Sequence, residues 1–222
     1  LHADSADRIV VSARVAGAPR DRDGIALFLV DGRASGLTRK GYPTQDGRRA
    51  ADLTLSGVRV TASDVMAGPG KALPAVERVA DEAIAALSAE AVGAMAALHA
   101  LTVDYMKTRR QFGVPIASFQ VLQHRAVDMY ANLEQARSMA MYATMMAGEA
   151  DADERRRAIS AAKVQIGRSA RFIGEQATQL HGGIGMTMEY LGGHYYKRLV
   201  VIDLTLGDAD HHLRELARAG GL

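Results

Sequence analysis

The chain has 222 residues, 48% of them hydrophobic and 23% charged, which is the composition of a soluble globular protein with one large domain or two smaller ones. Its 27 basic and 25 acidic residues leave a formal net charge of +2, without the basic stripe that nucleic-acid binding needs. No uninterrupted apolar run approaches the roughly 20 residues that span a bilayer, and the absence of cysteine excludes disulfides and thiolate metal sites. We therefore expect a cytoplasmic protein that binds neither membranes nor nucleic acids.

The first 66 residues have strand character. Period-two or continuous apolar patterns predict strands at residues 8–15, 25–30 and 51–56. Residues 17–24 form a polar hairpin connection, and the glycines and proline of residues 36–47 indicate a longer excursion. Three or four strands would leave long unpaired sheet edges. We therefore expect this half-sheet to need further strands that the chain does not contain. Because the chain starts at Leu1, so close to its first strand, we interpret it as a fragment.

From about residue 70 the apolar period becomes helical. A helix of roughly 35 to 40 residues is expected to end before Gly113, and a second helix to run from near Ser118 to Gly148. A third begins at Asp151, whose side chain suits a helix start, and ends at residues 182–183. Short helices at residues 195–205 and 209–219 complete an antiparallel bundle of four or five helices. The predicted core stripes are Ile84, Leu87, Ala91, Ala94, Leu98, Leu101 and Tyr105, then Phe119, Leu122, Ala126, Met129, Leu133, Ala136 and Ala140, then Ile159, Ala162, Ile166, Ala170, Ile173, Ala177 and Leu180.

Two glycine-punctuated stretches interrupt these helices, at residues 109–113 and 179–185. Each has a structural interpretation, because cations and glycine are common where helices end. Each also has a functional one: the guanidinium of Arg109 matches phosphate geometry, and a glycine turn exposes backbone N–H groups to a ligand. The pattern around Gly182 is not the GxGxxG that follows a strand in nicotinamide-binding proteins.

Histidines and acidic residues cluster near the C-terminus, at Asp208, Asp210, His211 and His212. Adjacent histidines on a helix point about 100° apart, and no metal-ligand spacing occurs, so no metal site is expected. The remaining histidines of the helical region, His99, His124, His181 and His194, are isolated and are interpreted as structural.

Taken in order, five motifs resemble the C-terminal half of an acyl-CoA dehydrogenase. They are Arg109-x-x-Phe112-Gly113, Phe119-Gln120, Ala162-Lys163, Gln179-x-x-Gly182-Gly183-x-Gly185 and Glu189-Tyr190. The resemblance implies an α+β chain in which residues 1–66 form the C-terminal part of a middle antiparallel β domain and residues 67–222 form a helical-bundle domain. It also implies binding of FAD at a subunit interface, with the cofactor contacts made by Arg109, Phe112, Gln120, Gln179, Gly182 and Gly183.

The catalytic base is where the sequence departs from the family pattern. Members of the family that this chain resembles place a glutamate before a Gly-Thr pair, and the matching position is Leu206. Other members carry the glutamate on the first long helix, where the matching position is Ala83, one residue from Glu82. The catalytic residue is therefore unassigned, with Asp208, Asp210 and Glu82 as weak candidates.

Residues 194–199 and 207–213 are most similar to a subgroup of small subunits of pimeloyl-CoA-type dehydrogenases. This resemblance implies an FAD-dependent subunit for α,β-desaturation of an acyl-CoA, working in a homo- or hetero-oligomer, as a dimer of dimers, with an electron-transfer flavoprotein or similar acceptor. The leading hypothesis is that a partner chain supplies the base. The alternatives are a self-sufficient enzyme with a displaced carboxylate and a non-catalytic assembly subunit.

Overall fold

The computed structural model describes residues 1–220. Two compact units divide the chain, Leu1–Val79 and the residues from Ala80 onward, and each is described by itself below. The domain boundary after residue 66 stays a prediction.

The first unit is built from two small antiparallel sheets. One has the order β1-β2-β5, from β1 (Arg8–Arg14), β2 (Ile25–Asp31) and β5 (Val65–Ala67), with β1 and β2 in register from Arg8 opposite Asp31 to Arg14 opposite Ile25. The other pairs β3 (Leu37–Pro43) with β4 (Arg49–Leu55), and a 3-10 turn (Ala62–Asp64) precedes β5. These positions confirm the predicted strands.

Strand β3 was not located by the sequence pattern, and it occupies most of the excursion predicted at residues 36–47. Gly36 and Gly47, with φ of 88° and 81°, lie in the turns outside the strand. Pro43 is the last residue of β3, in a sheet of only two strands where every strand is an edge. Edge positions tolerate proline, so its presence did not exclude a strand.

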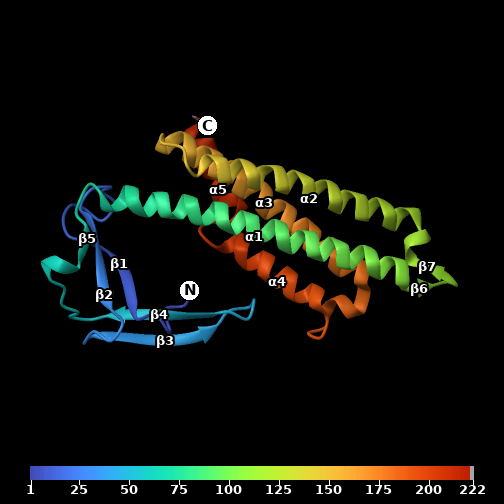
Figure 1. The fold of residues 1–222 in the computed structure, drawn as a ribbon, viewed down its shortest axis with the longest axis horizontal. Helices are drawn as coiled ribbons and strands as arrows, with labels where there is room; N and C mark the ends of the chain where they lie inside the picture. Colours follow the sequence, from blue (N-terminus) through green and yellow to red (C-terminus); the bar gives the residue numbers. More distant parts are fainter. Residues whose placement is uncertain (221–222) are drawn as a thin grey trace. The chain divides into compact units, whose positions relative to one another are not determined.

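In the second unit the described residues confirm the predicted antiparallel bundle (Figure 1). Its helices are α1 (Ala72–Thr108), which starts in the first unit, α2 (Gln120–Met146), α3 (Ala152–His181), α4 (Leu191–Leu204) and α5 (Ala209–Ala219). The connections contain a hairpin of β6 (Arg110–Gln111) and β7 (Val114–Pro115) and 3-10 turns at Ile116–Ser118 and Gly182–Met186. The hairpin was not predicted from the sequence, and α4 starts four residues before its predicted position at residue 195.

Helix α3 forms the centre of the core. All seven residues of its predicted stripe are buried, and so are Met129, Leu133, Ala136 and Ala140 of the α2 stripe. Its N-terminus confirms the Asp151 cap, whose side chain accepts hydrogen bonds from the backbone N–H groups of Asp153 and Glu154, both at 2.9 Å.

The predicted α1 stripe is confirmed in part, because Ile84, Ala91 and Leu98 are buried while its other four residues are half-buried. The buried face of the helix also carries Met95 and Met106, which the prediction omitted. Two buried hydroxyls share this face, Ser88 and Thr102, and each donates to the carbonyl four residues earlier. Because apolar residues cover most of α1 and polar ones lie on its core face, apolar spacing alone identified that face only in part.

By length and composition alone, α1 is also the one described helix that could cross a membrane. Its most apolar 18-residue window has a mean hydropathy of 1.6, with 39% of the window buried. The expectation that no segment is long enough to span a bilayer was based on uninterrupted runs of apolar residues. Helix α1 meets the length and composition criterion because it is judged by the mean hydropathy of a window. The core helix of a soluble bundle passes the same test, so the finding is weak evidence for a membrane.

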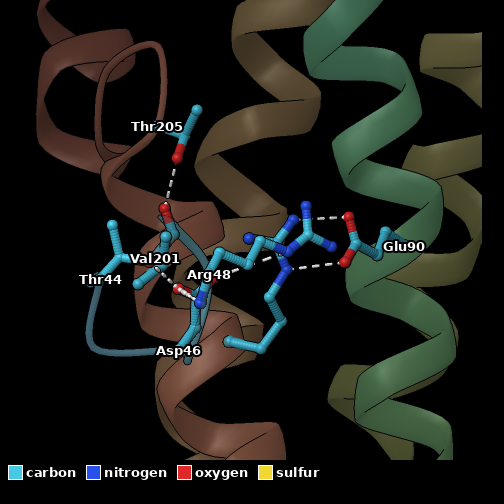
Figure 2. Close-up of polar contacts among 7 residues, drawn as sticks. Thr44, Asp46, Arg48, Glu90, Val201 and Thr205 are labelled. Carbon is cyan, nitrogen blue, oxygen red and sulfur yellow. Dashed lines mark hydrogen bonds and ion pairs between the residues drawn. The ribbon is translucent and has the colours of Figure 1, made fainter. Parts of the chain in front are cut away.

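Ion pairs tie α1 to the other helices of the second unit. Arg155 of α3 donates through Nε to Asp81 of α1 at 3.0 Å, and both side chains are buried. The carboxylate of Glu90, shown in Figure 2, accepts from Nε and Nη2 of Arg198 on α4, both at 2.7 Å. Arg155 therefore belongs to the core, although it reads in the sequence as part of a surface run of arginines.

Candidate functional site

The first glycine-punctuated stretch forms a tight hairpin after α1. The backbone N–H of Arg109 donates to Tyr105 at 2.8 Å, and the carbonyl of Arg109 accepts from Ile116 at 2.8 Å. Phe112 and Gly113 form a two-residue loop, with φ of 56° and 83°. Such loops need positive φ at both positions, which is costly for a bulky residue. Phe112 is nonetheless 84% exposed, so little burial within this chain offsets that cost.

Gln120 lies beside this hairpin, as the exposed first residue of α2. Phe112 and Phe119 pack edge to face with ring centroids 6.2 Å apart, which ties the hairpin to the start of α2. The predicted cofactor contacts Arg109, Phe112 and Gln120 are therefore grouped at the end of the bundle where α1 ends and α2 begins (Figure 1).

The second stretch ends α3 in a conformation that needs glycine. Gly182 has φ 62° and ψ −139°, and its N–H donates to the carbonyl of Gln179. This region of backbone space is essentially restricted to glycine. At Gly185 a Cβ would lie 2.8 Å from the carbonyl oxygen of Thr178, so the turn folds closely back onto α3.

This turn borders an open pocket of about 410 Å³. A Cβ added at Gly182 or Gly183 would meet no atom within 4 Å, so both glycines face open space. A Cβ at Gly174 would overlap the ring of Tyr196, so that glycine is what lets the ring lie against α3. The lining residues are Glu175, Thr178, Gln179, Gly182, Gly183, Met186 and Tyr196.

The two stretches lie at the same end of the bundle. Arg125, in the second turn of α2, donates to the side chain of Gln176 on α3 at 3.1 Å. The rings of Tyr105 on α1 and His181 on α3 are 4.6 Å apart. A guanidinium, exposed amides and a glycine turn beside a pocket fit the diphosphate and nucleoside part of FAD. The pocket is too small for the whole cofactor, so the rest of FAD needs other surfaces.

The predicted base position lies in a different turn, between α4 and α5. Leu206 has φ 61° and its side chain is 45% exposed, and Gly207 follows with φ 98°. The carbonyl of Leu206 contacts Nε2 of the buried His212 at 3.1 Å, and Nδ1 of His212 contacts the hydroxyl of Ser160 on α3 at 3.0 Å. A branched residue is thus held in the left-handed region by a buried histidine.

The carboxylate of Asp208 is occupied as the N-cap of α5. It accepts from the backbone N–H of His211 at 2.7 Å, and this hydrogen bond lowers the pKa of Asp208. Asp208 and His212 of the acidic and histidine cluster are thus both engaged in structural contacts. Among the described residues there is no group of three His, Asp or Glu side chains that could hold a metal ion.

Lys163 is a buried polar residue whose role the sequence did not reveal. It donates to the carbonyls of Ile202 and Asp203 at the end of α4, the latter at 3.0 Å. Burial lowers the pKa of its ammonium group to about 8, although Asp203 and Asp208 act in the opposite direction. The sequence signal that could have predicted its burial is its position between Ala162 and Ile166, which both belong to the predicted core stripe of α3.

The base positions and the glycine turn lie far apart along α3. Leu206 is tied through His212 to Ser160, and Glu82 is an exposed neighbour of Asp81, which pairs with Arg155. Gln179 is 19 residues beyond Ser160, which is about 28 Å along a helix. The structure therefore groups the six predicted cofactor residues at one end of the bundle and the candidate base positions near the N-terminal half of α3.

Small antiparallel sheets followed by this bundle form the fold of the C-terminal region of acyl-CoA dehydrogenases. The profile of the family described as "Acyl-CoA dehydrogenase, C-terminal domain" matches residues 74–221. The chain belongs to the acyl-CoA dehydrogenase family.

Individual relatives agree with this assignment. The acyl-CoA dehydrogenase IpdE2 of Mycolicibacterium smegmatis is 30% identical over 180 residues, which cover 81% of this chain and 52% of the relative. A solved structure, the Tcur3481-Tcur3483 steroid ACAD G363A variant, is 31% identical with a TM-score of 0.81, covering 97% of this chain and 55% of the other. PigA, solved with FAD and proline, is 25% identical with a TM-score of 0.89, covering 100% and 58%. The chain thus spans about half the length of the relatives it matches.

Proposed function

We propose that this chain is part of an FAD-dependent acyl-CoA dehydrogenase subunit whose catalytic base is supplied by a partner chain. The observation that carries the proposal is Leu206, an exposed apolar side chain on a left-handed turn. Desaturation of an acyl-CoA removes a proton from Cα and a hydride from Cβ. FAD, when bound, supplies the hydride acceptor. A leucine cannot accept the proton, so a carboxylate must come from elsewhere.

The cofactor contacts are proposed to serve a flavin shared between subunits. Arg109 would pair with the diphosphate, with Phe112 and Gln120 adding contacts from the same end of the bundle. Gln179, Gly182 and Gly183 would hold the adenosine end. The distance of about 28 Å along α3 between this turn and the base positions supports sharing, because the two ends of the bundle can then serve different flavins.

A relative with two different chains in its name supports the proposal that a partner supplies the base. The Tcur3481-Tcur3483 steroid ACAD is 31% identical to this chain, and the ChsE4-ChsE5 complex of Mycobacterium tuberculosis has a similar fold. The proposed assembly is a dimer of dimers in the cytoplasm, with an electron-transfer flavoprotein or similar acceptor. The proposed substrate class is an acyl-CoA thioester, and the pimeloyl-CoA resemblance of residues 194–199 and 207–213 is a narrower hypothesis within it.

The experiment compares the full-length protein alone with the same protein co-expressed with a candidate partner chain of the same family. Flavin per chain and oxidation of acyl-CoA substrates are read together. The expected result is turnover only in the co-purified complex. Oxidation of an acyl-CoA by the homo-oligomer at a rate equal to that of the complex contradicts the need for a partner base.

A displaced base within this chain is the second candidate, and Glu82 and Asp210 suit it better than Asp208. Asp208 is committed to its N-cap, and its lowered pKa makes it a weaker proton acceptor. Glu82→Gln and Asp210→Asn should each leave FAD bound, and loss of turnover in one of them would identify the base. Normal turnover in all three neutral variants, including Asp208→Asn, excludes this candidate. A complex without flavin bound at this chain's residues would instead favour a non-catalytic assembly subunit.

A further inference from the structure

Three aromatic rings meet where α1 and α3 end and α4 begins. Tyr105 lies in the last turn of α1, His181 is the last residue of α3, and Tyr190 is the N-cap of α4. The ring centroid of His181 lies 4.6 Å from that of Tyr105 and 4.7 Å from that of Tyr190, and the two tyrosines are 6.4 Å apart. We call these three residues the ring cluster.

Hydrogen bonds fix the central ring in one form. Nδ1 of His181 lies 2.7 Å from the carbonyl of Ala177, and Nε2 lies 2.8 Å from the hydroxyl of Tyr190. Because a carbonyl can only accept, Nδ1 carries a proton, and in the neutral imidazole Nε2 accepts from the tyrosine hydroxyl. Burial lowers the pKa of His181 and raises the pKa of Tyr190, so both groups stay neutral near pH 7.

Each side of the ring cluster is joined to one glycine-punctuated stretch. The carbonyl of Tyr105 accepts from the backbone N–H of Arg109 at 2.8 Å, where the hairpin begins. His181 directly precedes Gly182, and a Cβ at Gly185 would come within 3.1 Å of its Cβ. A shift of these rings would therefore move the hairpin and the glycine turn relative to each other.

We propose that Tyr105, His181 and Tyr190 are positioning residues that hold the two halves of the FAD site in register. This inference rests on the proposed function. Within the described part of the chain the ring cluster does not line the pocket of Gln179, Gly182 and Gly183, so it acts on FAD through the backbone that it holds.

The arrangement predicts that acid weakens FAD binding. The groups facing His181 are Tyr105 from α1, Tyr190 before α4 and the Ala177 carbonyl of its own helix. Burial is the main cause of its lowered pKa, and among the described residues no charged side chain contributes to it. Protonation puts a hydrogen on Nε2, so the Tyr190 hydroxyl must turn from donor to acceptor, and it buries a positive charge between the two tyrosine rings, which disfavours the observed arrangement.

The test measures FAD affinity of the full-length assembled protein, by flavin titration of the apoprotein between pH 5 and 8. Tyr190→Phe removes the hydroxyl and keeps the ring, and Tyr142→Phe, on an exposed part of α2, is the matched control. Loss of one such hydrogen bond should weaken FAD binding about three- to tenfold at pH 7.5. The acid-induced loss of FAD affinity should also begin at a higher pH in Tyr190→Phe. The reason is that neutral His181 loses the hydrogen bond from the Tyr190 hydroxyl to Nε2, which favours the neutral form.

Tyr105→Leu is a second variant, which removes a ring without touching the hydrogen bonds, and it should also weaken FAD binding. Melting curves confirm that each variant is folded at the assay temperature. Wild-type affinity and an unchanged pH profile in both variants overturn the inference while leaving the proposed function intact. Failure of the wild type itself to bind FAD overturns the proposed function and the inference together.

Discussion

Leu206 and Phe112 are branched or bulky residues held at positive φ, and among residues 1–220 only His2 is a further non-glycine example. The left-handed region costs such residues about 1–2 kcal/mol. Each lies in a stretch that the sequence marked for function, one at the base position and one at the hairpin tip. Backbone strain at both positions supports the interpretation that these two turns serve to expose Leu206 and Phe112 to a ligand or partner rather than to stabilise the fold.

At the residue scale, Gly182→Ala should reduce FAD binding. Alanine at this φ and ψ costs about 1–3 kcal/mol, so the turn is expected to change conformation and release its contact with the cofactor. Flavin content after gel filtration is the measurement.

Gly93→Ala is the matched control for that substitution. Gly93 is an exposed residue inside α1 where a Cβ meets no atom within 4 Å, so alanine should stabilise the helix by about 0.5–1 kcal/mol. Equal flavin content in the two variants would show that the Gly182 conformation does not matter for the cofactor.

At the element scale, the buried pair of Asp81 and Arg155 should be worth far more than a surface pair. Asp81→Asn leaves the Arg155 charge buried without its partner, and the expected loss is about 3–5 kcal/mol. Glu134→Gln on α2 breaks an exposed pair with Arg137 and should cost less than about 1 kcal/mol. Urea unfolding of the two variants checks the difference, and similar losses would contradict the burial of the first pair.

Lys163, which joins α3 to the end of α4, leads to a separate prediction about the pH dependence of stability. Its pKa is about 8 in the folded protein and about 10.5 when exposed, so between these values the unfolded chain binds more protons. Stability should therefore rise with pH across this window. Lys163→Met should lack that rise, and the difference between the two unfolding curves against pH isolates it. Parallel curves would show that Lys163 titrates normally.

Local pattern identified most elements because helix period and end signals are local properties. Asp151 and Gly182 marked both ends of α3, and α5 lies where its pattern placed it. Two omissions have physical reasons. Strand β3 exists because β4 pairs with it, and the buried face of α1 is selected by its neighbours, since its apolar residues fit more than one face.

At the scale of the whole molecule, two buried histidines predict acid sensitivity. Burial is the main cause of the lowered pKa of both His181 and His212. As pH falls below about 6.5 the unfolded chain takes up protons that the folded chain excludes, so stability falls. The melting temperature should be lower at pH 5 than at pH 7. If the melting temperature of the variant His212→Gln decreases less between pH 7 and pH 5 than that of the wild type, part of the decrease is due to His212.

The amino-acid sequence by itself determined the order of the helices, three of the strands, the glycine turns that end α1 and α3, and the leucine at the base position. These features depend on residue type and short spacing, which act locally. Only the tertiary structure decided which residues meet: the ring cluster of Tyr105, His181 and Tyr190, the burial of Lys163, and the separation of cofactor turn and base position along α3. These depend on helix packing, because a contact between residues far apart in the chain leaves no period in the sequence.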